Sequence, residues 1–159
     1  MLCSHASELA LRAALYLTLQ PPGKLTPVRE IAKGTGLPGP YLAKIMRRLI
    51  DARLVRAFRG PGGGVRLRQA PEAVNLAALV RAMEGPVGAE SCVLGLRPCS
   101  SEHPCSLHGR WTVLRAAIQD LLKETTLASL AQNGAGSLSN EHMVMNGKLI
   151  VKDENGERR

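Results

Sequence analysis

The sequence predicts a mainly α-helical protein with a small β-wing: a winged helix-turn-helix domain followed by a long dimerisation helix. Three helical patterns, the third of them basic, are followed by two strand patterns that flank a glycine-rich turn. A longer apolar helical pattern comes later in the chain. Residues 41–68 contain eight basic residues and one acidic residue, whereas the whole chain of 159 residues has a net charge of +8. These observations predict the fold class and a negatively charged partner.

The same patterns divide the chain into four segments. Residues 1–85 are predicted to form the winged helix-turn-helix DNA-binding domain, and residues 86–105 a cysteine-rich loop. Residues 106–131 are predicted to form the dimerisation helix, and residues 132–159, which show little periodicity, a disordered tail. The chain contains no run of about 18 apolar residues, so we expect no membrane span. The N-terminus does not resemble a secretory signal, and we therefore expect a cytoplasmic protein.

The first two helices are predicted at residues 6–20 and 27–33. The first is apolar around much of its circumference, which favours burial between other elements, and Pro21-Pro22-Gly23 ends it. Thr26 is placed to cap the second helix, and Pro27 suits its first helical position. A short turn containing glycine then leads to a third helix. Helix, short turn and helix form the DNA-binding unit whose second helix enters the major groove.

The third helix, Pro40–Ala52, is predicted to be the recognition helix. Its large apolar residues recur at helical spacing on one face: Leu42, Ile45, Met46, Leu49 and Ile50. Its basic residues lie elsewhere on the circumference, so the helix has one buried side and one side in water.

Two short strands and the turn between them are predicted to form the wing. The run Leu54–Phe58 is rich in residues that favour strands. Gly60-Pro61-Gly62-Gly63-Gly64 cannot hold a helix and supplies the turn of a hairpin. In Val65–Arg68 apolar and basic residues alternate, which is the period of a strand with one face in water.

Ten residues at the exposed side of the recognition helix or on the wing are predicted to contact DNA: Pro40, Tyr41, Lys44, Arg47, Arg48, Arg56, Arg59, Gly62, Gly63 and Arg66. Those on the helix would face the major groove, where Lys and Arg pair with guanine or with phosphate. The wing tip would approach the adjacent minor groove, and the arginines of the strands would hold phosphates, which position the protein without specifying a sequence. The alternative is a merely solvated basic face. The concentration of charge within this architecture disfavours it.

Two further helices are predicted after the wing. Asn75 is placed to cap a helix Leu76–Met83, and Glu84-Gly85-Pro86 ends it. From residue 106 to about residue 130 apolar residues return at helical spacing, in greater number than one small domain can readily bury. We expect a dimer interface here, because helix-turn-helix proteins commonly read two half-sites as two-fold dimers. Burial against the chain's own domain is the alternative.

Three cysteines and a histidine form a candidate metal site with the spacing Cys-x6-Cys-x5-Cys-x2-His: Cys92, Cys99, Cys105 and His108. Three thiolates and an imidazole suit a soft or borderline metal. The gaps are wider than those of structural zinc knuckles and suit the larger iron–sulfur clusters. From the spacing alone, an iron–sulfur cluster, a zinc ion and free or redox-active thiols all remain open. The sequence contains no Cys-x-x-Cys, nucleophile elbow, phosphate loop or HExxH motif, so we do not expect an enzyme.

A resemblance to one family is carried by Leu9–Arg12, Tyr41-Leu42, Leu54-Val55, the wing Arg59–Gly64, Leu79–Gly85 and the three-cysteine loop. The wing and the Glu84-Gly85 helix end are together specific. On these segments the chain from residue 7 to about residue 130 resembles the Rrf2 family of winged-helix transcriptional regulators. That family includes iron–sulfur regulators of the IscR, NsrR and RirA types.

The resemblance implies a homodimer that binds a palindromic operator in double-stranded DNA and carries an iron–sulfur cluster, either 2Fe–2S or 4Fe–4S. The three cysteines match the ligand positions of the family. His108 matches the histidine ligand of the IscR branch, whereas Glu8 lies where the NsrR branch places an acidic ligand from the other subunit. The six-residue gap after Cys92 departs from the commoner five. The fourth ligand and the cluster type therefore remain open.

The implied function is a transcriptional regulator, interpreted here as a repressor, that senses iron, redox state or nitric oxide through this cluster. The alternative is a winged-helix DNA-binding module with a structural zinc or a metal-free thiol site, which would regulate without a cluster.

Overall fold

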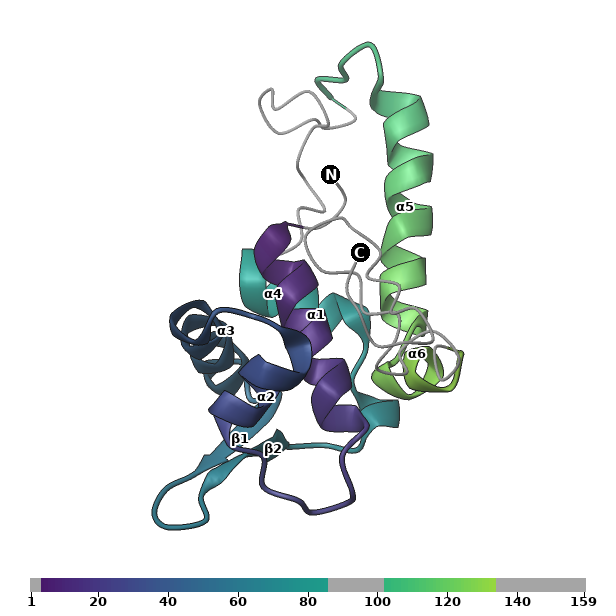
Figure 1. The fold of residues 1–159 in the computed structure, drawn as a ribbon. Helices are drawn as coiled ribbons and strands as arrows, with labels where there is room; N and C mark the ends of the chain where they lie inside the picture. The colour runs from purple at the N-terminus through teal and green to yellow at the C-terminus, as the bar shows by residue number, and fades with distance from the viewer. Residues whose placement is uncertain (1–3, 86–101, 134–159) are drawn as a thin grey trace, which may run out of the picture.

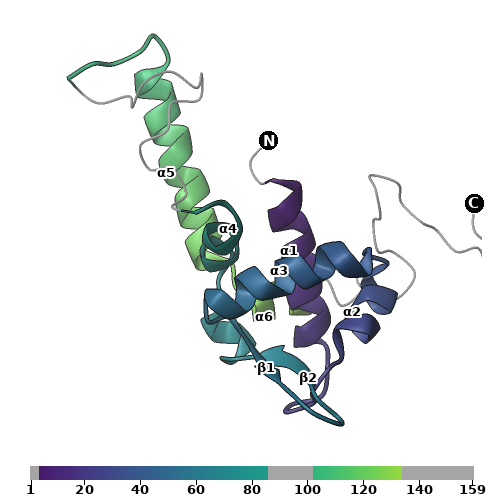
Figure 2. The same cartoon turned by 90° about the vertical axis from the view of Figure 1, so that its left-hand side faces the viewer.

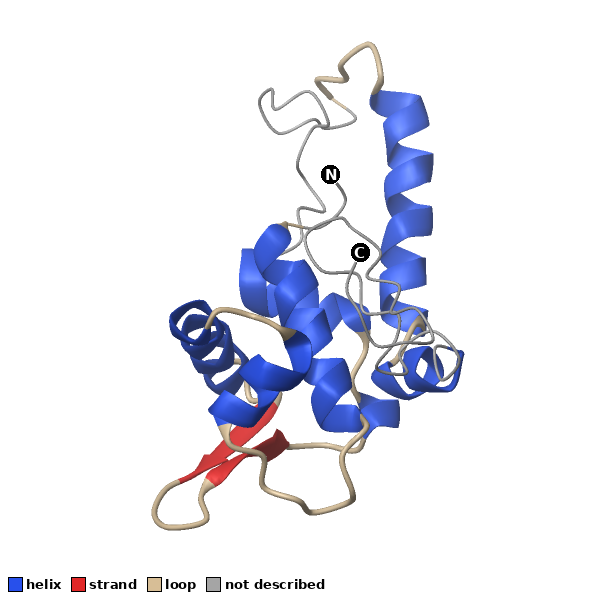
Figure 3. Ribbon diagram, viewed as in Figure 1, coloured by secondary structure: helices blue, strands red, loops and turns tan. Residues whose placement is uncertain are grey.

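A computed structural model describes residues 4–85 and 102–133 and confirms a mainly helical fold with a small antiparallel wing (Figure 1). The elements are α1 (His5–Thr18), α2 (Val28–Thr35), α3 (Gly39–Asp51), β1 (Val55–Phe58), β2 (Gly64–Leu67), the 3-10 helix η1 (Pro71–Ala73), α4 (Leu76–Glu84), α5 (His108–Glu124) and α6 (Leu127–Asn133). Figure 3 shows the two strands projecting from one end of the helical head, while α5 extends away from the other end. Cys92, Cys99 and residues 134–159 lie outside the described residues.

Helix α1 is the centre of the core, because it contacts α2, α3, α4, α6 and β2. Three alanines on α1 are completely buried: Ala10, Ala13 and Ala14. Their small side chains let the neighbouring helices approach closely. Where α2 crosses α1, Gly34 packs directly against the ring of Tyr16, and a β-carbon at residue 34 would overlap that ring. The core thus depends on small residues at its helix crossings.

The start of α2 differs from the prediction. The N-cap is Pro27, and no side chain caps the helix, so the expectation of a Thr26 cap is wrong. Thr26 instead pairs with β2: its amide donates to the Val65 carbonyl at 2.9 Å, and the Val65 amide donates to the Thr26 carbonyl at 2.9 Å. The Thr26 side chain is fully buried, and its hydroxyl oxygen has no hydrogen-bond partner. A long-range backbone pairing has therefore replaced a local cap.

The wing is a two-stranded hairpin in which Val55 pairs with Leu67 and Phe58 with Gly64. Gly60 and Gly62 have φ angles of +96° and +74°, a region that favours glycine. Gly63 has no room for a side chain, because a β-carbon there would overlap the Phe58 carbonyl oxygen. The glycine-rich turn is therefore required by the geometry of the hairpin itself.

Helix α4 begins as predicted. The Asn75 side chain accepts a hydrogen bond from the Ala78 amide at 3.0 Å, which confirms its role as N-cap. The helix ends at Glu84, one residue later than expected, and Gly85 follows it with a φ of +80°. The chain then enters residues 86–101, which lie outside the described residues.

The long helix expected from residue 106 to about residue 130 is two helices, α5 and α6. Between them Thr125 and Thr126 form an extended segment that pairs with the start of α4: the Leu76 amide donates to the Thr125 carbonyl, and Thr126 forms a bridge with Asn75. Thr126 and Ser129 then exchange side-chain to amide hydrogen bonds of 3.1 Å in both directions, which caps α6. The prediction of one continuous helix is therefore wrong at this junction.

The two halves of that segment have different environments. Leu127 and Ala128 of α6 are buried in the core of the head, so burial against the chain's own domain describes this half. In contrast, α5 exposes large apolar side chains, with Val113, Leu114 and Leu121 retaining 73%, 54% and 61% of their accessible surface. Only α5 therefore keeps the unpartnered apolar face that was expected of a dimerisation helix.

Candidate nucleic-acid interface

Helix α3 has the two faces that a recognition helix requires. Its buried side chains, Leu42, Ile45, Met46 and Leu49, anchor it to the head. The predicted contact residues of α3, Pro40, Tyr41, Lys44, Arg47 and Arg48, are all exposed. Figure 2 shows α3 crossing in front of α1, with the wing below it. The helix and the wing are therefore neighbours in the fold, since α3 also contacts β1.

Two neighbouring arginines of α3 have different partners. Arg47 is exposed, and its Nε contacts the Asp51 carboxylate within the same helix at 3.1 Å. Arg48 instead donates from Nη1 to the Met83 carbonyl oxygen at 2.9 Å. That carbonyl belongs to the last turn of α4, where cationic side chains are favoured by the helix dipole. Arg48 thus ties the recognition helix to α4.

The start of α3 lies beside the start of α1. The ring of Tyr41 stacks on that of His5 with centroids 6.4 Å apart and planes 30° apart. His5 also lies 3.4 Å from Glu8, whose other oxygen accepts a hydrogen bond from Arg12 at 2.6 Å. The sequence prediction did not include His5, because nothing in the local pattern indicates which helix ends meet in space.

The wing carries its arginines on one face. Arg56 and Arg66 are directly opposite each other in the register of the two strands. Both guanidinium carbons lie 5.0 Å from the centre of the Phe58 ring, within the range of cation–π attraction. Arg59 lies in the exposed turn with Gly62. Phe58 was not predicted as a site residue, although it is the chain's only phenylalanine and lies next to the glycine turn.

Few carboxylates neutralise this surface. Within residues 4–85 and 102–133 the ion pairs are His5 and Arg12 with Glu8, Lys24 with Glu30, and Arg47 with Asp51. Over those residues the remaining basic side chains of α3 and the wing form no ion pair: Lys44, Arg48, Arg53, Arg56, Arg59, Arg66 and Arg68. Uncompensated cations on a helix and an adjacent hairpin make a surface that attracts phosphate.

Part of the predicted metal site is described. Cys105 is half-buried, and His108 begins α5, its amide donating to the Cys105 carbonyl at 3.0 Å. The backbone therefore makes a turn that brings positions 105 and 108 together. The alternative ligand Glu8 is engaged by Arg12 and His5. Because Cys92 and Cys99 are outside the described residues, the four-residue ligand set stays a prediction.

A clasp between α1 and α4 lies immediately before the cysteine-rich segment. The Glu84 carboxylate accepts hydrogen bonds from the Ser4 amide at 2.7 Å and from the Ser7 hydroxyl at 2.5 Å. Burial raises the pKa of Glu84, but the hydrogen bonds from Ser4 and Ser7 outweigh it and hold the pKa below its ordinary value of 4.5. The clasp fixes the end of α4 against the start of α1.

None of the helices in the described part of the chain is long and apolar enough to cross a membrane.

A family model and individual known proteins identify the same family. The family model described as Rrf2, iron-dependent transcriptional regulator, matches residues 3–133. An HTH-type transcriptional regulator of Aquifex aeolicus is 34% identical over 132 residues, which cover 82% of this chain and 91% of that protein. The regulator IscR of Erwinia tasmaniensis is 33% identical over 124 residues, 78% of this chain and 74% of that protein.

A solved structure supports the same conclusion. CymR, titled the global cysteine regulator of B. subtilis, superposes with a TM-score of 0.70 at 27% identity over 82% of this chain and 95% of that one. The relatives are named as transcriptional regulators, in agreement with the expectation of a regulator rather than an enzyme. The exposed basic helix and wing, the family match and these relatives show that the chain belongs to the Rrf2 family of transcriptional regulators.

Proposed function

We infer that this regulator acts as a homodimer on a palindromic site in double-stranded DNA and that an iron–sulfur cluster controls its binding. The observation that carries the DNA part is the excess of exposed basic side chains over carboxylates on α3 and the wing. Lys44 and Arg47 face the major groove, and Arg59 with the glycine turn faces the adjacent minor groove. Arg56 and Arg66 hold backbone phosphates.

The exposed apolar face of α5 supports the homodimer. Val113, Leu114 and Leu121 account for half of the large apolar residues that are exposed in the described parts of the chain. Isolated exposed leucines are ordinary, but a cluster on one helix that extends from the domain indicates an interface. A two-fold dimer through α5 would present two α3 helices to two half-sites, which matches the symmetry of a palindrome.

The donor set supports an iron–sulfur cluster. Three thiolates from Cys92, Cys99 and Cys105 are the ligands that such clusters require, and the family is described as iron-dependent. We assign the fourth position to His108, because its amide donates to the Cys105 carbonyl at 3.0 Å and the backbone turn brings positions 105 and 108 together. The cluster would supply a group that changes with iron supply, oxidation or nitric oxide, and hence a bias on the position of α5.

The second candidate is regulation by the thiols themselves, or by a structural zinc. The similarity to a protein titled as a regulator of cysteine favours a thiol-based signal over a structural zinc. In either case the same loop would respond by oxidation or by holding zinc, and DNA binding would not depend on iron.

The experiment is anaerobic purification followed by visible absorption and by analysis of iron, sulfide and zinc. Broad absorption at about 320 to 460 nm, with matched iron and sulfide, is expected for a thiolate-bound cluster. The absorption should be lost in C92A, altered in H108A and retained in E8Q. A colourless protein with stoichiometric zinc would instead establish the structural module. If the DNA affinity is equal with and without the cluster, the cluster does not control binding. The function as a DNA-binding regulator would still stand.

A further inference from the structure

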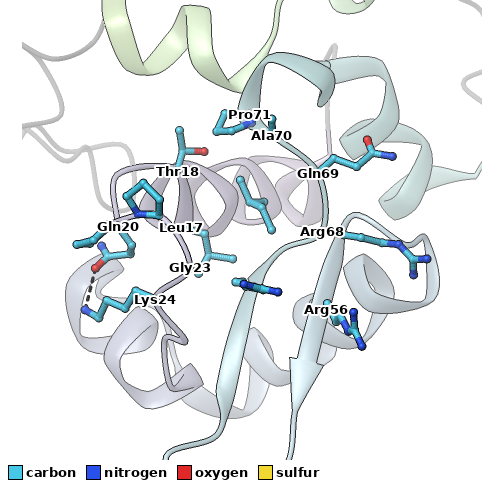
Figure 4. A pocket seen from close by; sticks show the side chains of 14 residues that line it. Leu17, Thr18, Gln20, Gly23, Lys24, Arg56, Arg68, Gln69, Ala70 and Pro71 are labelled. Carbon is cyan, nitrogen blue, oxygen red and sulfur yellow. Dashed lines mark hydrogen bonds between the residues drawn. The ribbon is translucent and has the colours of Figure 1, made fainter.

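A hollow of about 500 Å³ lies between the wing and the loop that joins α1 to α2 (Figure 4). Its walls come from the end of α1, from residues 20–24, from both strands and from residues 68–71, and none of its lining residues belongs to α3. The volume falls within the range of small-molecule sites. The hollow is therefore separate from the recognition helix, although it shares the wing with the DNA interface.

The charges that line this hollow are all positive. Four lining residues are basic and none is acidic: Lys24, Arg56, Arg66 and Arg68. In Figure 4, Lys24 lies on the loop side and Arg56 extends from β1, whereas Arg68, which follows the end of β2, extends away from Lys24. The Lys24 ammonium group contacts Gln20 at 2.9 Å and Glu30 at 2.6 Å, which leaves one of its three donors for a ligand. Within the described ranges the three arginines form no ion pair.

The wing places two of these cations, Arg56 and Arg66, next to each other although their charges repel. Like charges that face each other across a strand pair destabilise a sheet, and Arg56 and Arg66 face each other in register. The ring of Phe58 keeps both guanidinium groups in place, 5.0 Å from its centre. An anion bound beside them would remove the repulsion, and guanidinium groups bind phosphate and carboxylate through paired hydrogen bonds. The two arginines therefore form a cationic pair whose repulsion a bound oxyanion would relieve.

The other walls are largely apolar. Leu17 and Leu67 line the hollow together with Pro21, Pro22 and Pro71, while Thr18 and Gln69 add neutral polar groups. We propose that the hollow binds a phosphate or carboxylate group at Arg56, Arg66 and Lys24, on a ligand whose apolar part packs against Leu17 and Leu67. Two sources have this chemistry: a free small molecule and a phosphate of the DNA backbone. The apolar walls favour the small molecule. The site does not depend on the cysteine loop or on any metal.

The test measures thermal unfolding with phenyl phosphate and with inorganic phosphate, each against chloride at equal ionic strength. The variant R66Q removes one of the paired arginines, and K24Q removes the cation of the opposite wall. The matched control is R59Q, because Arg59 is an exposed arginine of the same wing that does not line the hollow. We expect saturating phenyl phosphate to raise the Tm of the wild type and of R59Q by about 5 °C. The rise should be absent in R66Q and reduced in K24Q.

A second measurement separates the two sources by adding a DNA duplex to the protein saturated with phenyl phosphate. If both ligands bind at once, the natural occupant is a small molecule. If they compete, the separate small-molecule site is overturned, and Arg56 and Arg66 remain as the backbone-phosphate contacts of the proposed function. The proposal is overturned if neither probe raises the Tm above the chloride control. It is also overturned if R59Q loses the shift as completely as R66Q, since the effect would then belong to the general charge of the wing.

Discussion

Arg47 and Arg48 are adjacent in the sequence, and the structure predicts opposite consequences for their removal. Arg48 donates a charge-assisted hydrogen bond of 2.9 Å to the Met83 carbonyl at the end of α4. A hydrogen bond involving a charged group contributes about 1.5–3 kcal/mol when buried, and exposure reduces this value. Because the Arg48 contact is only partly buried, we expect R48A to lower the free energy of unfolding by about 1 kcal/mol. This corresponds to a fall in Tm of about 4 °C.

Arg47 has no such role in stability. Its partner Asp51 is four residues away on the same helix, and the two side chains are 78% and 59% exposed. An exposed pair of this kind contributes at most about 0.5 kcal/mol, so the Tm of R47A should change by less than about 2 °C. Its DNA affinity should fall, and the slope of log affinity against log salt should decrease in magnitude by about 1.

Thermal unfolding and fluorescence anisotropy on a labelled duplex at several salt concentrations measure both quantities for both variants. Each variant serves as the control for the other, since the charge removed is the same. Equal losses of Tm in R47A and R48A would refute the assignment of Arg48 to α4. A salt slope that changes equally in both would show that Arg48 also binds phosphate, as the sequence alone suggested.

Four further outcomes follow from single side chains. T26V should raise the free energy of unfolding by about 1 kcal/mol in denaturant titrations, because it removes a buried hydroxyl without a partner and keeps the shape; a loss of stability would mean that the hydroxyl is hydrogen-bonded. G34A should lower it by about 1–3 kcal/mol in the same titrations, because the added methyl group overlaps an aromatic ring, and an unchanged midpoint would contradict that packing. The pKa of Glu84 is depressed, so its clasp stabilises the fold above pH 4.5 and is lost as the pH falls through the lower folded value. Wild type should therefore exceed E84Q in stability at pH 7 and converge with it as the pH falls below the folded pKa of Glu84, whereas a constant difference would exclude the carboxylate as the cause. L114K should convert dimers to monomers in light scattering, whereas the same substitution at the exposed Leu19, outside α5, should not; dimers in both would place the interface elsewhere.

Much of the head could be predicted from the sequence because its signals are local. The cap formed by Asn75 requires only the residues that follow it, and the wing is specified by consecutive glycines between two short strands. The buried face of α3 follows from apolar spacing alone. In each case the residues that determine the structure are close together in the sequence.

The differences arise where distant segments decide the structure. Thr26 has the chemistry of a cap, but pairing with Val65, far along the chain, places its side chain in the core. The helical pattern continues without interruption through Thr125 and Thr126, yet the backbone there pairs with residues 74–76 instead. Neither pairing leaves a sign in the local sequence.

In the candidate site, too, the sequence predicts local features but not those that depend on packing between distant segments. Exposure of Lys44 and Arg47 could be predicted from the helical period, whereas the role of Arg48 depends on where α4 packs. The position of Phe58 beneath two arginines required knowledge of the strand register. The cation-lined hollow combines residues from three separate parts of the chain, so no single motif marks it.

The junction at Thr125 and Thr126 fixes one end of α5 to the head, while the other end lies far from it. Backbone pairing with residues 74–76 makes the C-terminal end of the helix a fixed pivot on the head. The helix has 17 residues and so extends about 25 Å from that pivot to His108. At that length, a tilt of about 10° displaces the far end by about 4 Å. A small angular change at the pivot is therefore amplified at the end of α5 that carries His108. A movement imposed at His108 would act through the same length of helix on the head, to which α3 is fixed by its buried face.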